Sequence, residues 1–320
     1  MTRKFIIGSR GSDLALWQAN YVKKSLEHGF PERQFEIRII QTTGDQVLDV
    51  ALSKIGDKGL FTRQIETELL NGKIDFAVHS LKDLQTEQPA GLIIGAVCKR
   101  EIPNDIFISK TNGTIDDLAK GAKVATGSLR RKSQLLSYRP DLKIVEIRGN
   151  VPTRLRKFDE SDLDGLILAF AGVHRLGLGN RISQTIPFNI MLPAVGQGAV
   201  AIEVRESDAE VLELAAKLDD EITRTCITAE RAFLRRLEGG CQVPIGAHAV
   251  LSEDQITLDG LVGSLDGSVM FRETISGTLE EAEVLGTRLA EILIEQGAAK
   301  LLDAARAEAD TPDVGVEAAV

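Results

Sequence analysis

One cysteine of this chain lies in a setting that could support covalent chemistry. The segment EGGCQVPIG at 238–246 places Cys241 after a glycine pair and before a Val-Pro step. Glycines allow a tight turn there and let a bulky partner approach the backbone. A thiol on such a turn could capture an electrophile and keep it attached. A lone cysteine is equally compatible with an inert, small hydrophobic residue beside an ordinary turn, so this segment alone leaves both interpretations open. The other cysteines, Cys98 and Cys226, stand in ordinary mixed or helical surroundings.

A lysine–aspartate pair is the second chemical feature. Residues 76–79 read as a short buried strand, and Ser80, Lys82 and Asp83 follow it directly. Ligands of open α/β sheets bind at the carboxyl ends of strands. A solvated surface pair is the alternative, but surface pairs rarely follow a buried strand directly. We expect His79 to be a core or edge residue and predict no metal site, because no second His or Cys stands at metal-ligand spacing.

Arginines recur just past predicted strand ends. The turn SRGS at 9–12 opens a helix and offers hydroxyls, a guanidinium and free N–H groups to an anion, although an ordinary turn capped by Ser12 would look the same. A helix predicted from Leu129 carries two arginines in its first turn, where cations oppose the helix dipole at a cost of up to about 1 kcal/mol. A bound anion would offset that cost. Together the arginines indicate a polycarboxylate or phosphate ligand between two α/β lobes; they are Arg10, Arg130, Arg131, Arg148, Arg154 and Arg175.

The elements that must position these side chains alternate between strand and helix. Hydrophobic periodicity predicts strands at 5–7, 35–40, 76–79, 92–97, 123–126, 143–147, 165–169 and 199–204. Helices are predicted at 13–28, 60–71, from 129, after Pro152, and at 209–217 and 222–237. Beyond Cys241, strands at 247–251, 256–262 and 269–275, with a hairpin at Asp266-Gly267, precede helices at 279–294 and 298–305. The long polar stretch 41–59, which carries Lys54 and Lys58, is expected to be a lid.

This order predicts an α/β fold. We expect two periplasmic-binding-protein-like α/β lobes joined by a hinge, because the strand at 199–204 can return to the first sheet, plus a small α+β C-terminal domain. The predicted domains are 1–99 with 199–218, then 105–193, and then 220–307, which carries Cys241. Residues 308–320 are expected to form a disordered tail.

Composition narrows the class of protein. At 320 residues the chain exceeds what one core usually serves, and its net charge of −9 disfavours nucleic acid as a partner. No stretch of 18 apolar residues occurs and the N-terminus shows no signal or transit pattern. Three cysteines, an odd number, favour a reducing compartment. The chain is therefore expected to be cytoplasmic, without membrane partners, and monomeric because no coiled-coil heptad or exposed apolar helix demands a partner.

Taken together, the motifs resemble those of the porphobilinogen deaminase, or hydroxymethylbilane synthase, family. The resemblance runs from residue 7 to about residue 249 and rests on the joint order of SRGS at 9–12 with LALWQ at 14–18, KGLF at 58–61, VHSLKDL at 78–84, GSLRR at 127–131, IRGN at 147–150, LPAVGQG at 192–198 and EGGCQVPIG at 238–246. Two positions depart from the family pattern. Gly127 stands where a second serine is common, and Gln85 where a proline is, which blurs the assignment of ligand-binding hydroxyls.

The resemblance implies an enzyme, a transferase of tetrapyrrole and haem biosynthesis. The family joins four porphobilinogen molecules head to tail with loss of ammonia and releases hydroxymethylbilane. Growth is primed by one dipyrromethane cofactor, held by a thioether to a cysteine that corresponds to Cys241. A carboxylate facing the pyrrole nitrogen would stabilise the cations of each step, and Asp83 is the catalytic candidate.

Other roles follow from the same resemblance. The expected cofactor-binding residues are Lys82, Asp83, Thr126, Ser128, Arg130 and Arg131. The expected substrate-binding residues are Arg10, Ser12, Ser80, Arg148, Arg154, Arg175 and Gln197, and the expected lid residues are Lys54 and Lys58.

The competing interpretation is a two-lobe binding protein that closes on a small anion without catalysis. Such proteins need no cysteine and usually carry a signal peptide. A regulatory sensor of the same shape would normally add a DNA-binding helix-turn-helix, for which the sequence has no pattern.

Overall fold

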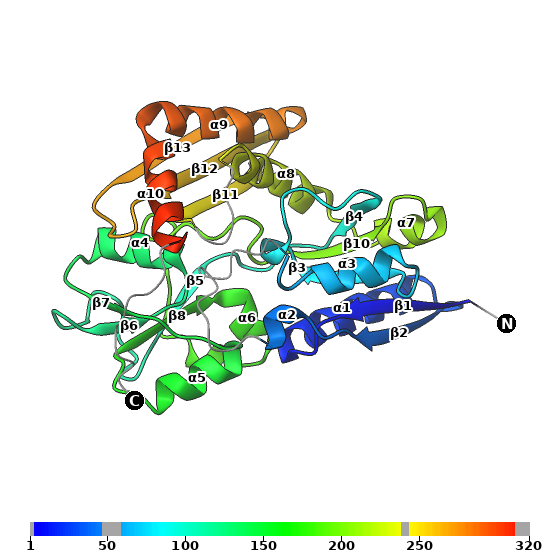
Figure 1. Cartoon of the computed structure of the whole chain (residues 1–320), viewed down its shortest axis with the longest axis horizontal. Helices are drawn as coiled ribbons and strands as arrows, with labels where there is room; N and C mark the ends of the chain where they lie inside the picture. The colour runs from blue at the N-terminus through cyan, green and yellow to red at the C-terminus, as the bar shows by residue number, and fades with distance from the viewer. Residues whose placement is uncertain (1–2, 47–58, 238–242, 311–320) are drawn as a thin grey trace.

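The computed structural model describes residues 3–46, 59–237 and 243–310. Within these residues the strands form three sheets, two of five strands and one of three. Figure 1 shows the two larger sheets side by side and the three-stranded sheet above them, with α9 along its upper side. Cys241, Lys54 and Lys58 lie outside the described residues.

The first lobe is built on a sheet of order β2-β1-β3-β10-β4. Its strands are β1 (Lys4–Ser9), β2 (Gln34–Ile39), β3 (Phe76–Ser80), β4 (Leu92–Val97) and β10 (Val200–Arg205), and its helices are α1 (Asp13–Gly29), the short α2 (Thr43–Gln46), α3 (Arg63–Leu70) and α7 (Ala209–Ala216). One face of the sheet carries an apolar core that includes the fully buried Phe5, Phe76 and Ile202.

The second lobe repeats this arrangement with a sheet of order β7-β6-β8-β5-β9. Its strands are β5 (Asp105–Ser109), β6 (Lys123–Ala125), β7 (Lys143–Val145), β8 (Gly165–Ala169) and β9 (Gln184–Thr185), and its helices are α4 (Leu129–Tyr138), α5 (Val151–Asp159) and α6 (Phe170–Arg175), with the 3-10 turn η3 (Gly179–Arg181). Sequence analysis missed both β5 and β9. It predicted no element between the strands at 92–97 and 123–126.

Each large sheet contains one antiparallel strand that arrives from the other lobe. β10 follows the second lobe and pairs antiparallel with β3 and β4, whereas β5 follows the first lobe and pairs antiparallel with β8. The chain therefore crosses between the lobes twice. This confirms the predicted fold class of two α/β lobes with a hinge and the predicted return of the 199–204 strand.

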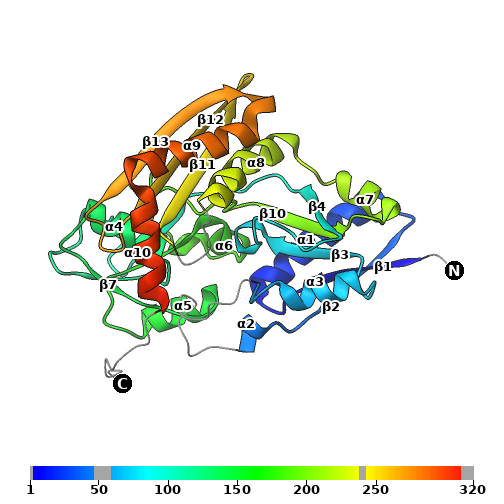
Figure 2. The same ribbon diagram turned by 45° about the horizontal axis from the view of Figure 1, so that its top comes forward.

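The third unit is a meander backed by helices. Its strands are β11 (Ile245–Ser252), β12 (Gln255–Gly263) and β13 (Met270–Thr278), which pair antiparallel. α8 (Glu221–Arg236) precedes these strands, and α9 (Ala282–Gln296) follows them after the 3-10 turn η4 (Leu279–Glu281). The two helices cover one face of the sheet and share one apolar core with it (Figure 2). The predicted hairpin is confirmed, since Gly267 adopts a φ of 74°. α10 (Ala298–Asp310) ends later than expected, so the tail predicted from residue 308 begins too early.

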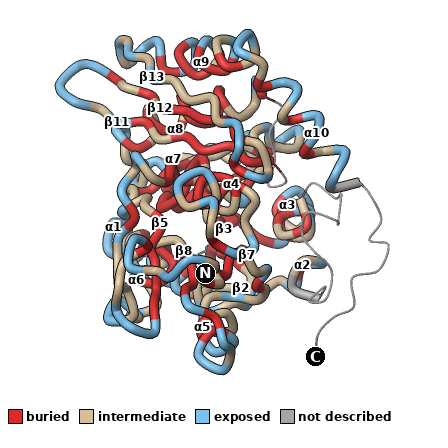
Figure 3. The backbone as a smooth tube through the Cα atoms, turned by 90° about the vertical axis from the view of Figure 1, so that its left-hand side faces the viewer, coloured by how far each residue is buried: buried red, intermediate tan, exposed pale blue. Residues whose placement is uncertain are grey.

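Glu230 of α8 ties the two crossings to the third unit. Its fully buried carboxylate accepts hydrogen bonds from Nη1 of Arg100 at 2.6 Å and from the backbone N–H of Gly196 at 2.8 Å, one on each crossing. It also accepts one from the backbone N–H of Ala249 on β11 at 2.9 Å. Figure 3 shows mostly buried backbone around α8, next to β11 and β12.

Candidate active site

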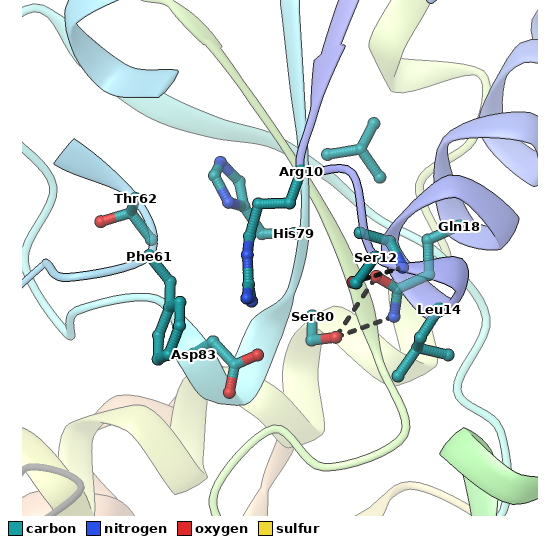
Figure 4. A pocket seen from close by; sticks show the side chains of 11 residues that line it. Arg10, Ser12, Leu14, Gln18, Phe61, Thr62, His79, Ser80 and Asp83 are labelled. Atoms are coloured by element: carbon teal, nitrogen blue, oxygen red, sulfur yellow. Dashed lines mark hydrogen bonds between the residues drawn. The ribbon is translucent and has the colours of Figure 1, made fainter. Parts of the chain in front are cut away.

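The exposed carboxylate of Asp83 stands at the end of a buried strand. Residues 76–79 of β3 are all buried, and the 3-10 turn η2 (Leu81–Asp83) then brings the chain to the surface. Asp83 lines a pocket with Arg10 and Ser12 from the turn after β1, and with Ser80 (Figure 4). The structure thus brings together four residues that sequence analysis assigned to the site.

Hydrogen bonds inside this pocket fix its polar wall. Ser12 caps α1 by accepting a hydrogen bond from the N–H of Ala15, so the predicted capping role is confirmed. Nε2 of the buried Gln18 donates to Oγ of Ser80 at 2.8 Å. The guanidinium of Arg10 lies over the Phe61 ring, 4.1 Å from its centroid. Sequence analysis did not assign Gln18 to the site, although a polar residue on the buried face of an amphipathic helix was a detectable signal.

Lys82 points away from this pocket toward the second lobe. Its Nζ donates to Oε1 of Gln197 at 3.3 Å. Burial lowers the pKa of Lys82 to about 8, opposed by the nearby carboxylates of Asp83 and Asp105. Gln197 in turn donates from Nε2 to Oδ1 of Asp105 at 2.9 Å. A side chain from the second crossing therefore connects the strand end of one lobe with the sheet of the other.

Asp105, at the start of β5, is the main functional candidate that sequence analysis missed. It is fully buried and accepts hydrogen bonds from Nη1 of Arg130 at 2.7 Å and from Nε and Nη2 of Arg131 at 3.0 and 2.8 Å. Burial alone would raise the pKa of Asp105, but the Arg130 and Arg131 guanidinium groups outweigh it and hold that pKa well below its usual range. Sequence analysis expected a bound anion near the first turn of α4, and the carboxylate of Asp105 supplies part of that negative charge.

The other hydroxyls of this region organise the turn before α4. Ser128 is the N-cap of α4 and accepts from the N–H of Arg131, while the buried Thr126 accepts from the N–H of Ser128 at 3.3 Å. A Cβ at Gly127 would lie 2.9 Å from the carbonyl oxygen of Ile147, so this tight approach explains the glycine. Both hydroxyls therefore bind backbone N–H groups of the turn that leads into α4.

The remaining arginines fall into two groups. Burial, followed by the charges of Arg131 and Arg148, lowers the pKa of Arg154 to about 10, whereas Asp83 acts in the opposite direction. The charges of Arg131, Arg148 and Asp83 therefore all act on Arg154 in the cleft. Nη2 of Arg175 instead donates to the carbonyl oxygen of Gly198 at 2.6 Å, and its guanidinium lies 5.3 Å from the Trp17 ring centroid. Arg175 thus joins α6 of the second lobe to α1 and to the second crossing.

The two described cysteines are unsuited to covalent chemistry. Cys98 and Cys226 are both buried, and burial raises the pKa of Cys98 to about 12 and that of Cys226 to about 11. Such thiols stay protonated and unreactive near neutral pH. Within residues 3–46, 59–237 and 243–310, no group of three or more His, Cys, Asp or Glu side chains could hold a metal ion, and no helix is long and apolar enough to span a membrane.

Comparison with known families covers nearly the whole chain. Residues 5–213 match the family model for the porphobilinogen deaminase dipyromethane cofactor binding domain, and residues 224–295 match the model for the porphobilinogen deaminase C-terminal domain. The porphobilinogen deaminase of Pelotomaculum thermopropionicum is 52% identical over 308 residues, which cover 96% of this chain and 99% of the relative. That of Carboxydothermus hydrogenoformans is 50% identical over 310 residues, which cover 97% and 100%.

Solved structures resemble the chain more distantly. The methionine-binding protein MetQ is 15% identical, with a TM-score of 0.41 over 67% of this chain and 89% of that one. The second substrate-binding domain of a putative amino acid ABC transporter from Streptococcus pneumoniae is 14% identical, with a TM-score of 0.44 over 72% and 93%.

Proposed function

The chain belongs to the porphobilinogen deaminase family, and on that premise we propose that it is a transferase whose catalytic carboxylate is Asp83. The family's cofactor is dipyrromethane, and its activity is the synthesis of hydroxymethylbilane from porphobilinogen. The observation that carries the proposal is the position of Asp83, exposed at a strand end inside a pocket with a guanidinium and three hydroxyls. A pyrrole with two carboxylate arms and a reacting cationic centre requires such a combination of charges.

The role of Asp83 follows from the charge that the reaction develops. Loss of ammonia from porphobilinogen leaves a cationic methylene-pyrrole, and the coupling step again places positive charge on a pyrrole nitrogen. A fixed carboxylate within hydrogen-bond reach of that nitrogen stabilises both cations. The carboxylate needs no proton transfer to do this, so an ionised Asp83 serves throughout the cycle.

The residues at the lobe interface fit a dipyrromethane group. Its acetate and propionate arms are anionic, and the cleft carries more cations than carboxylates. The cations are Lys82, Arg130, Arg131, Arg148 and Arg154, and the carboxylates are Asp83, Asp105 and Glu146. We assign the holding of the cofactor carboxylates to Lys82, Arg130 and Arg131, with Thr126 and Ser128 beside them, and its attachment to Cys241. When bound, the cofactor supplies the nucleophilic carbon to which the first substrate ring is joined.

Substrate carboxylates are assigned to a second set of residues. Arg10, Ser12 and Ser80 lie in the Asp83 pocket. The charge of Arg148 acts on Arg154. Arg175 donates to the carbonyl oxygen of Gly198 on the second crossing, and Gln197 of that crossing donates to the carbonyl oxygen of Pro103. Lys54 and Lys58 are proposed as lid residues on the sequence resemblance.

The experiment that tests the catalytic proposal is a comparison of Asp83→Asn with Asp116→Asn. Both aspartates lie outside the sheets, but Asp116 bonds the Tyr138 hydroxyl away from the pocket. We expect Asp83→Asn to lower the rate of hydroxymethylbilane formation by about 10²-fold or more with unchanged thermal unfolding, and Asp116→Asn to keep the wild-type rate. An Asp83→Asn enzyme that turns over at the wild-type rate would remove Asp83 from the mechanism.

We also propose that the protein works as a cytoplasmic monomer that does not bind nucleic acid. The net charge of −9 opposes nucleic-acid binding. The large apolar side chains exposed in the described residues come from different elements, among them Trp17, Ile39, Tyr138 and Val284, and scattered residues of this kind are normal for a monomer surface. The domain boundaries 1–99 with 199–218, 105–193 and 220–307 are retained as a proposal.

A further inference from the structure

Helix α8 of the third unit contacts the chain on both sides of Asp83. Ile227 of α8 belongs to the same buried apolar cluster as Leu81 and Leu84. These two leucines flank Lys82 and Asp83 in the sequence, and they are 1% and 6% exposed. Asp83 between them is exposed. The backbone is therefore fixed at both ends of the turn that presents the carboxylate.

One helical turn further along α8, Arg231 binds the segment that follows Asp83. Its Nη2 donates to the carbonyl oxygens of Gln85 at 2.7 Å and Thr86 at 2.9 Å, and to Oε1 of Gln88 at 3.2 Å. Nε2 of Gln88 donates to the same carbonyl oxygen of Gln85 at 2.9 Å. The segment 85–88 is thus held at one guanidinium group.

The guanidinium of Arg231 is a buried cation bound by uncharged oxygens. The residue is 9% exposed, and burial lowers the pKa of Arg231 to about 10, so it stays protonated near neutral pH. Hydrogen bonds from a charged donor are shorter and stronger than those between neutral groups. Arg231 therefore restricts segment 85–88 more narrowly than the apolar contact of Ile227 would alone.

The position of α8 connects this segment to the rest of the site. The helix ends at Arg236, and the segment that carries Cys241, outside the described residues, follows shortly after. Glu230, the residue before Arg231, accepts hydrogen bonds from both crossings. Two consecutive side chains of one helix therefore bind the crossings and the segment next to Asp83.

We propose that Arg231 is a positioning residue for the reaction, which holds the segment after Asp83 so that its carboxylate keeps a fixed place relative to α8 and the cofactor-bearing segment. The inference rests on the catalytic role proposed for Asp83. Arg231 is not among the described residues that line the Asp83 pocket, so it acts through the aspartate and needs no contact with the substrate.

The test compares Arg231→Met with Arg231→Lys, each as full-length, cofactor-loaded enzyme verified by intact mass. Arg231→Met frees segment 85–88, and because a small displacement of a catalytic group slows the reaction, we expect kcat to fall about tenfold with KM within about twofold of the wild type. Arg231→Lys keeps a charged donor near the same carbonyl oxygens and should recover most of kcat. A wild-type kcat in Arg231→Met would overturn the proposal, even if that variant unfolds at a lower temperature.

A double variant shows whether Arg231 acts through Asp83. Asp83→Asn already lacks the charge that Arg231 positions, so adding Arg231→Met should leave the kcat of Asp83→Asn unchanged. If Arg231 acted on the rate through another group, the two losses would multiply, and that result would overturn the proposal. An Asp83→Asn enzyme with the wild-type rate would instead refute the proposed function together with the inference, so the two failures are distinguishable.

Arg224→Met is the matched control. Nη2 of Arg224 joins the same helix to the carbonyl oxygen of Gly95 on β4 at 3.1 Å, in the same lobe as Asp83. This contact lies away from the end of β3 that leads to Asp83, since Ser80 is paired with Val200 at the start of β10 and Ile94 with Glu203 further along. We expect Arg224→Met to lower the unfolding temperature and to keep the wild-type kcat.

A second variant keeps the proposal falsifiable if Arg231→Met does not fold. Gln88→Leu removes one acceptor of Arg231 at a half-buried position. We expect it to lower kcat by about threefold, with no further loss in the Asp83→Asn background. A wild-type kcat in Gln88→Leu would then overturn the proposal.

Discussion

Arg131 donates to one oxygen of Asp105 through both Nε and Nη2, at 3.0 and 2.8 Å, and both residues are buried. The other oxygen of Asp105 accepts from Arg130. One chain carboxylate therefore orients the two guanidinium groups proposed to bind the cofactor, and it does so from the strand that enters the second lobe. The arginines are pre-organised by an internal anion before any ligand carboxylate reaches them.

The first prediction concerns this carboxylate. Asp105→Asn leaves two buried guanidinium groups without their anion, and breaking a buried ion pair on one side typically costs about 3–5 kcal/mol. We expect a clearly lower free energy of unfolding and a smaller cofactor-loaded fraction, measured by thermal unfolding and intact mass. Asp117→Asn, at an exposed carboxylate that accepts hydrogen bonds from the backbone N–H and the hydroxyl of Thr114, is the control. Equal stability of the two variants would show that Asp105 is dispensable for holding the arginines.

The second prediction divides the arginines by role. Arg130 is buried beside Asp105, whereas Arg10 lies in the Asp83 pocket. Losing a charge-assisted hydrogen bond to a buried carboxylate costs about 1.5–3 kcal/mol. Arg130→Gln should therefore yield mostly cofactor-free protein of lower thermal stability, and Arg10→Gln cofactor-loaded protein that adds rings slowly. Intact mass before and after brief exposure to porphobilinogen distinguishes them, and identical loading and stalling would show one undifferentiated basic surface.

The limits of the sequence argument are visible in the same residues. Several site residues directly follow a predicted strand or lie in the first turn of a predicted helix, so the local sequence is enough to place them at the cleft. These residues are Arg10, Lys82, Asp83 and Arg131. Asp105 is different, because its partners are 25 and 26 residues away along the chain and its strand was not predicted. Residue type alone cannot show which carboxylate a tertiary fold will bury.

Glu203 illustrates the same limit on a central strand. The predicted strand at 199–204 places Glu203 in a strand, but from the sequence alone a glutamate in a strand is expected to face solvent. The antiparallel insertion of β10 between β3 and β4, under α3, makes it a fully buried neighbour of His79. His79 itself was predicted as a core or edge residue and is buried, whereas the burial of Glu203 depends on long-range strand pairing.

The third prediction concerns the tether. We expect native protein to exceed its sequence mass by a covalent dipyrromethane and Cys241→Ala to lack both the adduct and activity. Cys98→Ala and Cys226→Ala should retain both, because the pKa values of these thiols, about 12 and 11, keep them protonated near neutral pH. Alkylation at pH 8 should accordingly spare them in the folded protein. A fully active protein of unmodified mass would rule out the tether.

The fourth prediction uses the lowered pKa of Lys82. Burial lowers this pKa from 10.5 to about 8, so between these values the unfolded chain binds more protons than the folded chain. The free energy of unfolding must then rise with pH across that window, by at most about 3 kcal/mol. We expect this rise in Cys241→Ala protein and not in Cys241→Ala/Lys82→Met, with both measured by denaturant unfolding from pH 7 to 11. Parallel stability curves would mean that Lys82 stays charged in the cofactor-free cleft.

The last prediction concerns the junction of the crossings with the third unit. Glu230 is fully buried and binds Arg100 at 2.6 Å together with backbone groups of the second crossing and of β11. Glu230→Gln should lower the free energy of unfolding by about 3–5 kcal/mol, because it leaves the Arg100 guanidinium buried without its anion.

The double variant Arg100→Met/Glu230→Met removes both charges. Its loss of stability should be smaller than the sum of the losses in Arg100→Met and Glu230→Met. The measurement is a double-mutant cycle by denaturant unfolding, with Arg156→Met/Glu160→Met, an exposed pair on α5, as the additive control. Additive losses at Arg100 and Glu230 would show that the two side chains stabilise the junction independently, through their backbone contacts and not through their mutual ion pair.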